Sequence, residues 1–279
     1  MNYFNYHTHT LYCDGKEGPE SFIQEAIRKE MKAIGFSSHS PLPFDNGYSI
    51  KSNQLDVYQK QIRDLQTKYK DTIAVFLALE FDYIPGISSD FSILKNSMNL
   101  DYTIGSVHLV KEERSGLLWF IDGGRANYEE GINKLFNGAV EKAVETYYLQ
   151  VQEMIISQQP DIIGHIDKVK MYNKNQFFSE QDKWYKKLVK DTLTIVSNSK
   201  CIIEVNTRGI YKKKCDSLYP GIEILKEIYK MDIPITISSD AHSPQELTSL
   251  FPETIAVLKD IGFKKIKYFT TQAWKDCLI

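Results

Sequence analysis

The chain has 279 residues, of which 42% are hydrophobic and 25% are charged, and its formal net charge is −2 at pH 7. This length suffices for a large buried core and lies within the range of one α/β barrel, so we expect a single domain over residues 1–279. The small net charge gives no electrostatic reason to expect nucleic acid or a membrane surface as a partner, which leaves small molecules as the expected ligands.

The spacing of the cysteines and the length of the apolar runs indicate where in the cell the protein is located. The four cysteines, Cys13, Cys201, Cys215 and Cys277, are far apart and form no C-x-x-C pair, which speaks against a disulfide framework and against a zinc ribbon. The longest apolar run, residues 73–79, is too short to span a bilayer, and the N-terminus lacks a basic region followed by an apolar one. We therefore expect a soluble protein of the cytoplasm.

Short runs rich in branched and aromatic residues alternate with longer stretches of helical periodicity, the pattern of parallel strands joined by crossover helices. Seven strands are predicted, at residues 2–7, 33–37, 73–79, 102–106, 162–164, 201–205 and 234–238. Helices are predicted between them at residues 19–32, 53–69, 135–155, 180–199 and 222–231. The fold class is therefore α/β, and seven strands indicate a barrel, which need not be a regular one.

All the histidines follow a predicted strand directly or within a few residues, and none lies in a predicted helix: His7, His9, His39, His108, His165 and His242. The carboxylates Glu80, Asp240 and Asp14 keep similar positions. The carboxyl ends of parallel barrel strands open onto one face, so these nine side chains should converge there. A lone histidine is usually a surface or hydrogen-bonded core residue, but burying so many polar groups around one cavity is costly without a compensating ligand.

Divalent cations supply that compensation. Side chains alternate along a strand, so His7 and His9 point the same way, as do Asp240 and His242 if the chain stays extended there. Zinc takes about four ligands and octahedral manganese or iron about six, so nine ligands predict two or three ions, with Glu80 as the natural bridge. A histidine and carboxylate set without thiolate favours zinc, manganese or iron over calcium or magnesium.

Seven motifs resemble, in order, those of the PHP (polymerase and histidinol phosphatase) superfamily: HTHT…D, GFSSHSP, LALEFDYIPG, DYTIGSVH, DIIGHIDKVKMYN, EVNTRG and SSDAHSP. The likeness runs from residue 5 to about residue 245, and it is greatest to the histidinol-phosphatase branch. It implies a distorted, TIM-like, seven-stranded β/α barrel with a trinuclear metal site at the carboxyl end of the strands. Carried over by motif, one ion would be held by His7, His9, Glu80 and Asp240, a second by Glu80, His108 and His165, and a third by Asp14, His39 and His242.

The expected activity is hydrolysis of a small phosphate monoester, L-histidinol phosphate in histidine biosynthesis, by attack of a metal-bound hydroxide on phosphorus. Asp240 or His242 should orient this hydroxide or move its proton. Arg208 is expected to grip the phosphate through its fork, with Lys170 as a second cation. The run 212–214 fits an ordinary solvated face better than a phosphate site.

Two further features concern the surroundings of the ions. The segment 109–131 offers acidic and aromatic groups to a substrate that carries an amine and an imidazole, and Gly123 and Gly124 would permit it to move as a lid. Its candidates are Glu112, Glu113, Trp119 and Asp122. Cys13, although adjacent to Asp14, is expected to face away from the ions.

Three alternatives compete with this interpretation. A nuclease of the superfamily should carry a basic, aromatic groove or an attached polymerase domain, and the composition shows neither. A phosphotyrosine-protein phosphatase is harder to exclude from charge, but the local motifs fit the histidinol branch better. A metal-binding barrel without catalysis predicts defective ligand positions, whereas none is missing here. The sequence leaves the oligomeric state open.

Overall fold

The computed structural model describes residues 3–271 and 273–279, and within them seven parallel strands form one sheet in the order β1-β2-β3-β4-β7-β8-β9. The strands are β1 (Phe4–Asn5), β2 (Ala33–Phe36), β3 (Ala74–Asp82), β4 (Tyr102–Ser106), β7 (Ile162–Ile163), β8 (Ile202–Asn206) and β9 (Ile235–Ser238). All seven predicted strands are confirmed, although Asn2, the first residue of the predicted 2–7 strand, lies outside the described residues. β3 continues beyond its predicted end at Leu79 and so carries both Glu80 and Asp82.

The two strands at the ends of this order meet just beyond their last residues. Thr8 and Ala241 form a parallel bridge, in which the Ala241 amide donates to the His7 carbonyl and the His9 amide donates to the Ala241 carbonyl. The sheet therefore closes into a barrel at its carboxyl end, as expected.

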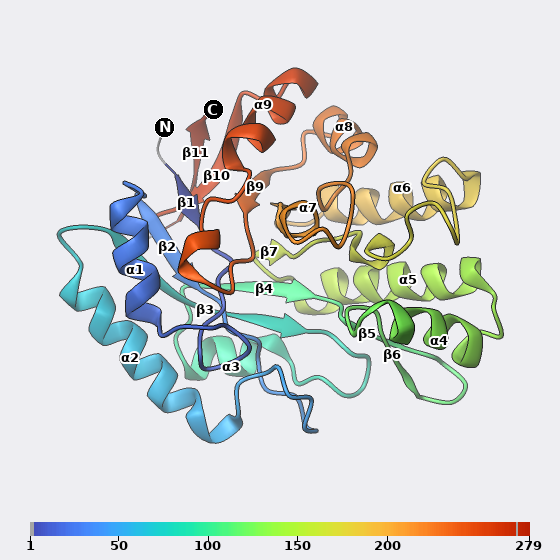
Figure 1. Cartoon of the computed structure of the whole chain (residues 1–279), viewed down its shortest axis with the longest axis horizontal. Coiled ribbons are helices and arrows are strands. Elements are labelled where there is room, and N and C mark those ends of the chain that lie inside the picture. Colours follow the sequence, from blue (N-terminus) through green and yellow to red (C-terminus); the bar gives the residue numbers. More distant parts are fainter. Residues whose placement is uncertain (1–2, 272) are drawn as a thin grey trace.

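Helices surround the strands (Figure 1). They are α1 (Pro19–Arg28), α2 (Leu55–Lys68), α3 (Phe91–Ser97), α4 (Arg125–Leu135), α5 (Val140–Gln158), α6 (Lys183–Ser197), α7 (Arg208–Tyr211), α8 (Ile222–Lys230) and α9 (Phe251–Ile261). Single 3-10 turns occur at η1 (Ser52–Gln54), η2 (Lys168–Lys170) and η3 (Pro244–Glu246). No helix in the described part of the chain is long and apolar enough to cross a membrane.

One helix prediction was wrong at its start. The stretch 135–155 was expected to be continuous, but α4 ends at Leu135 and α5 begins only at Val140. Asn137 and Gly138 between them both have positive φ, at 51° and 77°, a conformation that interrupts an α-helix. The apolar stripe that suggested one helix belongs mostly to α5, which buries Ala143, Tyr147 and residues beyond them.

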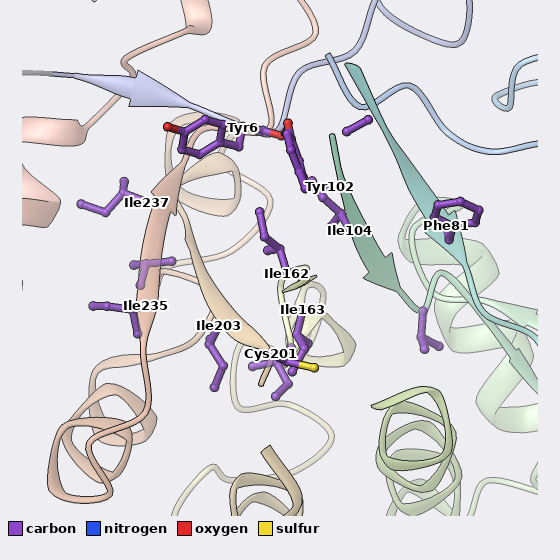
Figure 2. Packing of buried hydrophobic residues seen from close by; sticks show 14 of the residues in the cluster. Tyr6, Phe81, Tyr102, Ile104, Ile162, Ile163, Cys201, Ile203, Ile235 and Ile237 are labelled. Atoms are coloured by element: carbon purple, nitrogen blue, oxygen red, sulfur yellow. Dashed lines mark hydrogen bonds between the residues drawn. The ribbon is translucent and has the colours of Figure 1, made fainter. Parts of the chain in front are cut away.

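A hairpin that the sequence did not predict closes the other end of the barrel. Strands β10 (Lys265–Phe269) and β11 (Trp274–Leu278) pair antiparallel, and Phe269 and Trp274 join a cluster of buried rings with Tyr6, Phe76 and Tyr102. The hydroxyl of Tyr102 donates to the Tyr6 carbonyl oxygen at 2.5 Å. Figure 2 shows Tyr6 and Tyr102 side by side, with isoleucines of β7, β8 and β9 further along the core. The hairpin thus adds apolar rings to the core on the side away from the histidines.

Candidate metal centre

The carboxylate of Glu80, on β3, lies at the centre of the histidine cluster. Its Oε2 is 3.1 Å from His7 Nε2, 3.4 Å from His9 Nε2 and 3.1 Å from His39 Nδ1. Its Oε1 is 3.2 Å from His165 Nε2 and 3.7 Å from His108 Nε2. Five imidazoles from four separate segments therefore surround one buried carboxylate, as the strand-end pattern predicted.

The remaining predicted ligands lie against the same cluster. Asp240 Oδ1 is 3.3 Å from His9 Nε2 and 3.5 Å from His242 Nδ1. Asp14 Oδ2 is 3.1 Å from His242 Nε2, and Asp14 Oδ1 is 3.8 Å from His39 Nε2. The structure thus brings all nine side chains together at the carboxyl end of the strands.

Among the described residues, three groups have ligand atoms close enough to share an ion: His7, His9 and Asp240; His39, Glu80 and His108; and His9, Asp14, His39 and His242. They overlap the three predicted ligand sets but share two histidines differently. His39 stands beside Glu80 and His108, where His165 was expected, while His165 Nε2 still lies 3.2 Å from His108 Nε2. The division of ligands among ions stays a prediction.

Two backbone features deliver the acidic ligands. Asp240 has a φ of 50°, so the chain is not extended there, contrary to the condition on which its pairing with His242 was predicted. A non-glycine residue in this left-handed region is uncommon and is concentrated at functional sites. Asp14 is carried by a tight turn, in which a Cβ at Gly15 would lie only 2.3 Å from the His9 carbonyl oxygen. Only glycine therefore lets this turn fold over His9.

The electrostatics of the cluster fit cation binding. Burial lowers the pKa of His9 and that of His39 to about 4 each, which keeps both imidazoles neutral near pH 7. Burial alone would raise the pKa of Glu80, but His7, His39 and His108 hold it well below its usual value. Neutral imidazoles beside ionised carboxylates are the protonation states that metal ligands require, and His9, His39 and Glu80 have them. At His7 and His108 burial alone would lower the pKa, but neighbouring carboxylates raise it, so an ion must displace a proton there.

Buried nitrogens without partners provide a further test of fit. In the part of the chain that the structure describes, His7 Nε2, His39 Nδ1, His108 Nδ1 and His165 Nδ1 are buried and have no hydrogen-bond partner. Such groups are rare in native proteins and call for an explanation. An ion would supply one for His7 Nε2 and His39 Nδ1, which each lie 3.1 Å from Glu80 Oε2, whereas His108 and His165 turn Nε2 rather than Nδ1 toward that carboxylate. Imidazole and carboxylate without thiolate is a donor set that suits zinc, manganese or iron. The residues present therefore fit divalent transition-metal ions.

Two further buried carboxylates, Asp82 and Glu204, contact this cluster and were missed in the sequence. Asp82 Oδ1 accepts from the His108 amide at 2.9 Å, and its Oδ2 accepts from the Tyr48 hydroxyl at 2.7 Å. Glu204 Oε1 lies 2.5 Å from His7 Nδ1. A signal was present for both, because Asp82 is two residues after Glu80 on the same strand face and Glu204 is the only charge in the strand IIEVN.

A cavity of about 150 Å³ opens above the cluster. It is lined by Asp14, His39, Tyr48, Glu80, His108, Phe120, Asp122, Lys168, Arg208, Lys214, Asp240 and His242. Arg208, the predicted phosphate ligand, lines it and donates from Nη1 to the Asp240 carbonyl oxygen at 2.7 Å. The predicted arginine therefore stands beside the ligand cluster.

The lysines differ from expectation. Lys170 is not among the lining residues: its buried Nζ lies 2.7 Å from Asp167 Oδ2. Lys168 and Lys214 line the cavity instead, although the run 212–214 was expected to be a solvated face. The reason is the 3-10 turn η2, where successive side chains diverge by about 120°, so residues 168 and 170 point to different sides.

The segment 109–131 contains a hairpin of β5 (Leu109–Lys111) and β6 (Leu118–Phe120). Of its candidates only Asp122 lines the cavity. Trp119 is 1% exposed and packs on Tyr128, so it serves the core. The structure adds Phe120, which stacks on Tyr48 with ring centroids 5.6 Å apart.

Cys13 contacts a candidate ligand from the side. Its Sγ lies 3.5 Å from His9 Nδ1, whereas His9 Nε2 is the nitrogen beside Glu80 and Asp240. Among the described residues, none of the three groups that could hold an ion includes Cys13.

Comparisons with known proteins agree with this geometry. A family model described as the PHP domain matches residues 5–208. A curated protein of Bacillus subtilis named histidinol-phosphatase is 26% identical over 251 residues, which cover 85% of this chain and 92% of that protein.

Two solved structures share the fold. A histidinol phosphate phosphatase from Lactococcus lactis, solved in complex with zinc, L-histidinol and phosphate, is 22% identical, with a TM-score of 0.72 and 98% coverage of both chains. A structure from Listeria monocytogenes, also 22% identical, has a TM-score of 0.78 over 90% of this chain and 99% of its own.

Proposed function

The chain belongs to the PHP domain family, and from this premise we propose that it is a histidinol-phosphate phosphatase, a metal-dependent enzyme that converts L-histidinol phosphate and water to L-histidinol and phosphate. The observation that carries this proposal is the Glu80 carboxylate surrounded by five histidines beside a cavity that contains an arginine and two lysines. Such a site combines metal ligands with anion-binding groups, and its size suits a small phosphate monoester.

Two or three zinc, manganese or iron ions occupy the cluster in this proposal. Their ligands are His7, His9, Asp14, His39, Glu80, His108, His165, Asp240 and His242. Divalent ions of this kind, when bound, offset the charge of a phosphate ester and provide an activated nucleophile at neutral pH. The proposal takes the chain as one catalytic domain, because Asp240 and His242, which follow the family match, lie against His9 and Asp14.

The protein's cations hold the phosphate. The Nη1 of Arg208 already donates to the Asp240 carbonyl, and the guanidinium has further N–H groups with which to bind phosphate oxygens. Lys168, rather than Lys170, supplies a second charge at the cavity wall. Asp240 and His242 stand beside the reacting centre, where the Asp240 carboxylate accepts or holds the proton of the attacking water and His242 orients it.

The outer wall of the cavity suits the alcohol half of the substrate. Tyr48 and Phe120 present stacked aromatic rings, and Asp122 presents a carboxylate. A cationic amine and a flat imidazole are the groups that such a wall binds, through charge and ring contacts.

One comparison of substrates tests the function. Purified protein supplied with Mn²⁺ or Zn²⁺ should release phosphate from L-histidinol phosphate much faster than from phosphotyrosine peptides, nucleotides or single-stranded DNA. A preference for phosphotyrosine would identify the protein as a protein phosphatase, and a preference for DNA would identify it as a nuclease. Either result would remove the proposal while leaving the metal centre in place.

A further inference from the structure

Glu204, on β8, is a buried carboxylate whose acceptor positions are used by donors from four segments. Its Oε1 accepts from the hydroxyl of Ser238 and lies 2.5 Å from His7 Nδ1. Its Oε2 accepts from the His165 amide at 2.9 Å and from Asn206 Nδ2 at 3.0 Å. The side chain is 1% exposed, so water does not compete for these contacts. Glu204 thus ties the ends of β1, β7 and β9 to its own strand.

This arrangement decides which nitrogen of His7 faces the cluster. An ionised carboxylate accepts hydrogen bonds and cannot donate them, so the contact with Glu204 requires a proton on His7 Nδ1. In the neutral ring the lone pair is then on Nε2. That nitrogen is the one without a hydrogen-bond partner, and it lies 3.1 Å from Glu80 Oε2 and 3.8 Å from Asp240 Oδ1.

We propose that Glu204 is a positioning residue that fixes the tautomer and the ring orientation of His7, so that Nε2 is held toward the divalent ion shared with His9, Glu80 and Asp240. The inference rests on the proposed function in one respect, that a metal ion occupies the cluster. A carboxylate behind a ligating imidazole makes the ring a better ligand and removes its freedom to rotate. Glu204 touches neither substrate nor ion and acts through His7.

The other outer carboxylate makes a different contact. Asp82 Oδ2 lies 3.4 Å from His108 Nδ1, but that nitrogen has no hydrogen-bond partner, and the carboxylate is engaged by Tyr48 and by the His108 amide. Asp82 therefore fixes backbone and loop, whereas Glu204 contacts a ring nitrogen directly. This difference makes Glu204 the stronger candidate for setting a tautomer.

Glu204→Gln tests the proposal with little change of shape. A glutamine has one accepting oxygen, and its NH₂ group must face one of two pairs of donors, so the His7 contact is lost or weakened. We expect the dissociation constant for Zn²⁺, measured by competition with a chelating dye, to rise about 10–100-fold. Asp167→Asn is the matched control, since it removes a buried carboxylate that contacts Lys170 and Gly221 rather than a histidine. This control should leave Zn²⁺ affinity unchanged.

Nuclear magnetic resonance reports the tautomer of His7 directly, which a purely structural role of Glu204 would leave unchanged. In the zinc-loaded wild-type protein, the ¹H–¹⁵N spectrum should show His7 bound through Nε2, with a strongly downfield Nδ1 proton that is absent from His7→Gln. This proton should shift upfield or vanish in Glu204→Gln and persist in Asp167→Asn. Zinc bound through Nδ1 in the wild type, or equal Zn²⁺ affinity in Glu204→Gln, would overturn the proposal.

The wild-type spectrum requires no variant of Glu204, so the proposal stays open to refutation even if Glu204→Gln fails to fold. The experiments also contain no substrate. If L-histidinol phosphate is not hydrolysed while Glu204→Gln still weakens Zn²⁺ binding, the proposed function fails and the positioning role stands. If the protein hydrolyses the substrate but Glu204→Gln binds Zn²⁺ normally, only the positioning role fails.

Discussion

Lys168 and Asp122 form an ion pair at the wall of the cavity, with Nζ 2.9 Å from Oδ2. Lys214 approaches the other oxygen of Asp122 at 3.0 Å. One carboxylate at the end of the β5–β6 hairpin therefore holds two lysines from two other segments against the metal cluster. This relationship places two lysines at the wall of the cavity, where the proposed substrate would bring its phosphate.

Asp122 yields a prediction about pH. Burial would raise its pKa, but Lys168 and Lys214 hold it well below its usual value. A carboxyl whose folded-state pKa is depressed contributes stability above its unfolded-state pKa, about 3.9, and loses it only as pH falls toward the folded-state value. The difference in unfolding free energy between wild type and Asp122→Asn should therefore be constant from pH 8 to pH 5. Urea titrations at several pH values measure it, and a difference that shrinks within that range would contradict the ion pair.

Glu80→Gln should abolish turnover while the fold persists. The carboxylate contacts five histidines, so its loss removes more than the outer partners whose replacement costs about 10–100-fold. We expect kcat to fall more than a hundredfold and the metal content, measured by elemental analysis, to fall with it. Circular dichroism should show an unchanged barrel. Full activity with a full metal complement would refute the central role given to Glu80.

Arg208→Lys should weaken phosphate binding, because a lysine cannot reproduce the fork of the guanidinium. Hydrogen bonds to charged groups contribute about 1.5–3 kcal/mol, so kcat/KM should fall roughly tenfold to a hundredfold. Lys213→Met is a suitable control, because Lys213 is exposed in the same segment and does not line the cavity. Equal kinetic constants for Arg208→Lys and wild type would remove Arg208 from the site.

Lys170→Met decides between the role expected from the sequence and the contacts in the structure. Its ammonium is paired with the buried Asp167, and removing one partner of a buried pair costs about 3–5 kcal/mol. We expect urea unfolding to show a loss of that order, with kcat/KM of the folded protein close to wild type. Lys168→Met should lower kcat/KM, and it should cost less unfolding free energy than Lys170→Met, because Lys214 still pairs with Asp122. A large kinetic defect in Lys170→Met would restore it as a phosphate ligand.

Chelation should inactivate the protein and lower its thermal stability together. An ion that binds the folded state and not the unfolded state stabilises by RT ln(1 + [L]/Kd), which is about 4 kcal/mol at a thousandfold excess over Kd. Treatment with a chelator, followed by scanning calorimetry, should show a lower Tm. Zn²⁺, Mn²⁺ or Fe²⁺ should restore both Tm and turnover, whereas Ca²⁺ should not. Unchanged Tm and activity after metal removal would end the case for a metal centre.

The sequence predicted the barrel and the convergence of its histidines because both follow from local pattern. Branched strands such as IAVFLAL and ligands at their ends are readable one segment at a time. Contacts between segments were not readable in this way. Lys168 and Lys170 look alike in GHIDKVK, and only the 3-10 turn sends one to the cavity and the other to Asp167. The hairpin 265–278 was missed because Trp274 packs on Tyr6 and Tyr102, which lie far away in the sequence, so no local pattern marks the contact.

That hairpin bears on how the products leave the enzyme. Trp274 packs with Tyr6 and Phe269 on one side of the ligand cluster, and the cavity that reaches the cluster lies on the other side. We therefore expect both products to leave through the same opening of the cavity by which the ester enters. Inorganic phosphate that stays bound after the alcohol has left would occupy the site of the next ester molecule. Inhibition by phosphate should therefore be competitive with the ester.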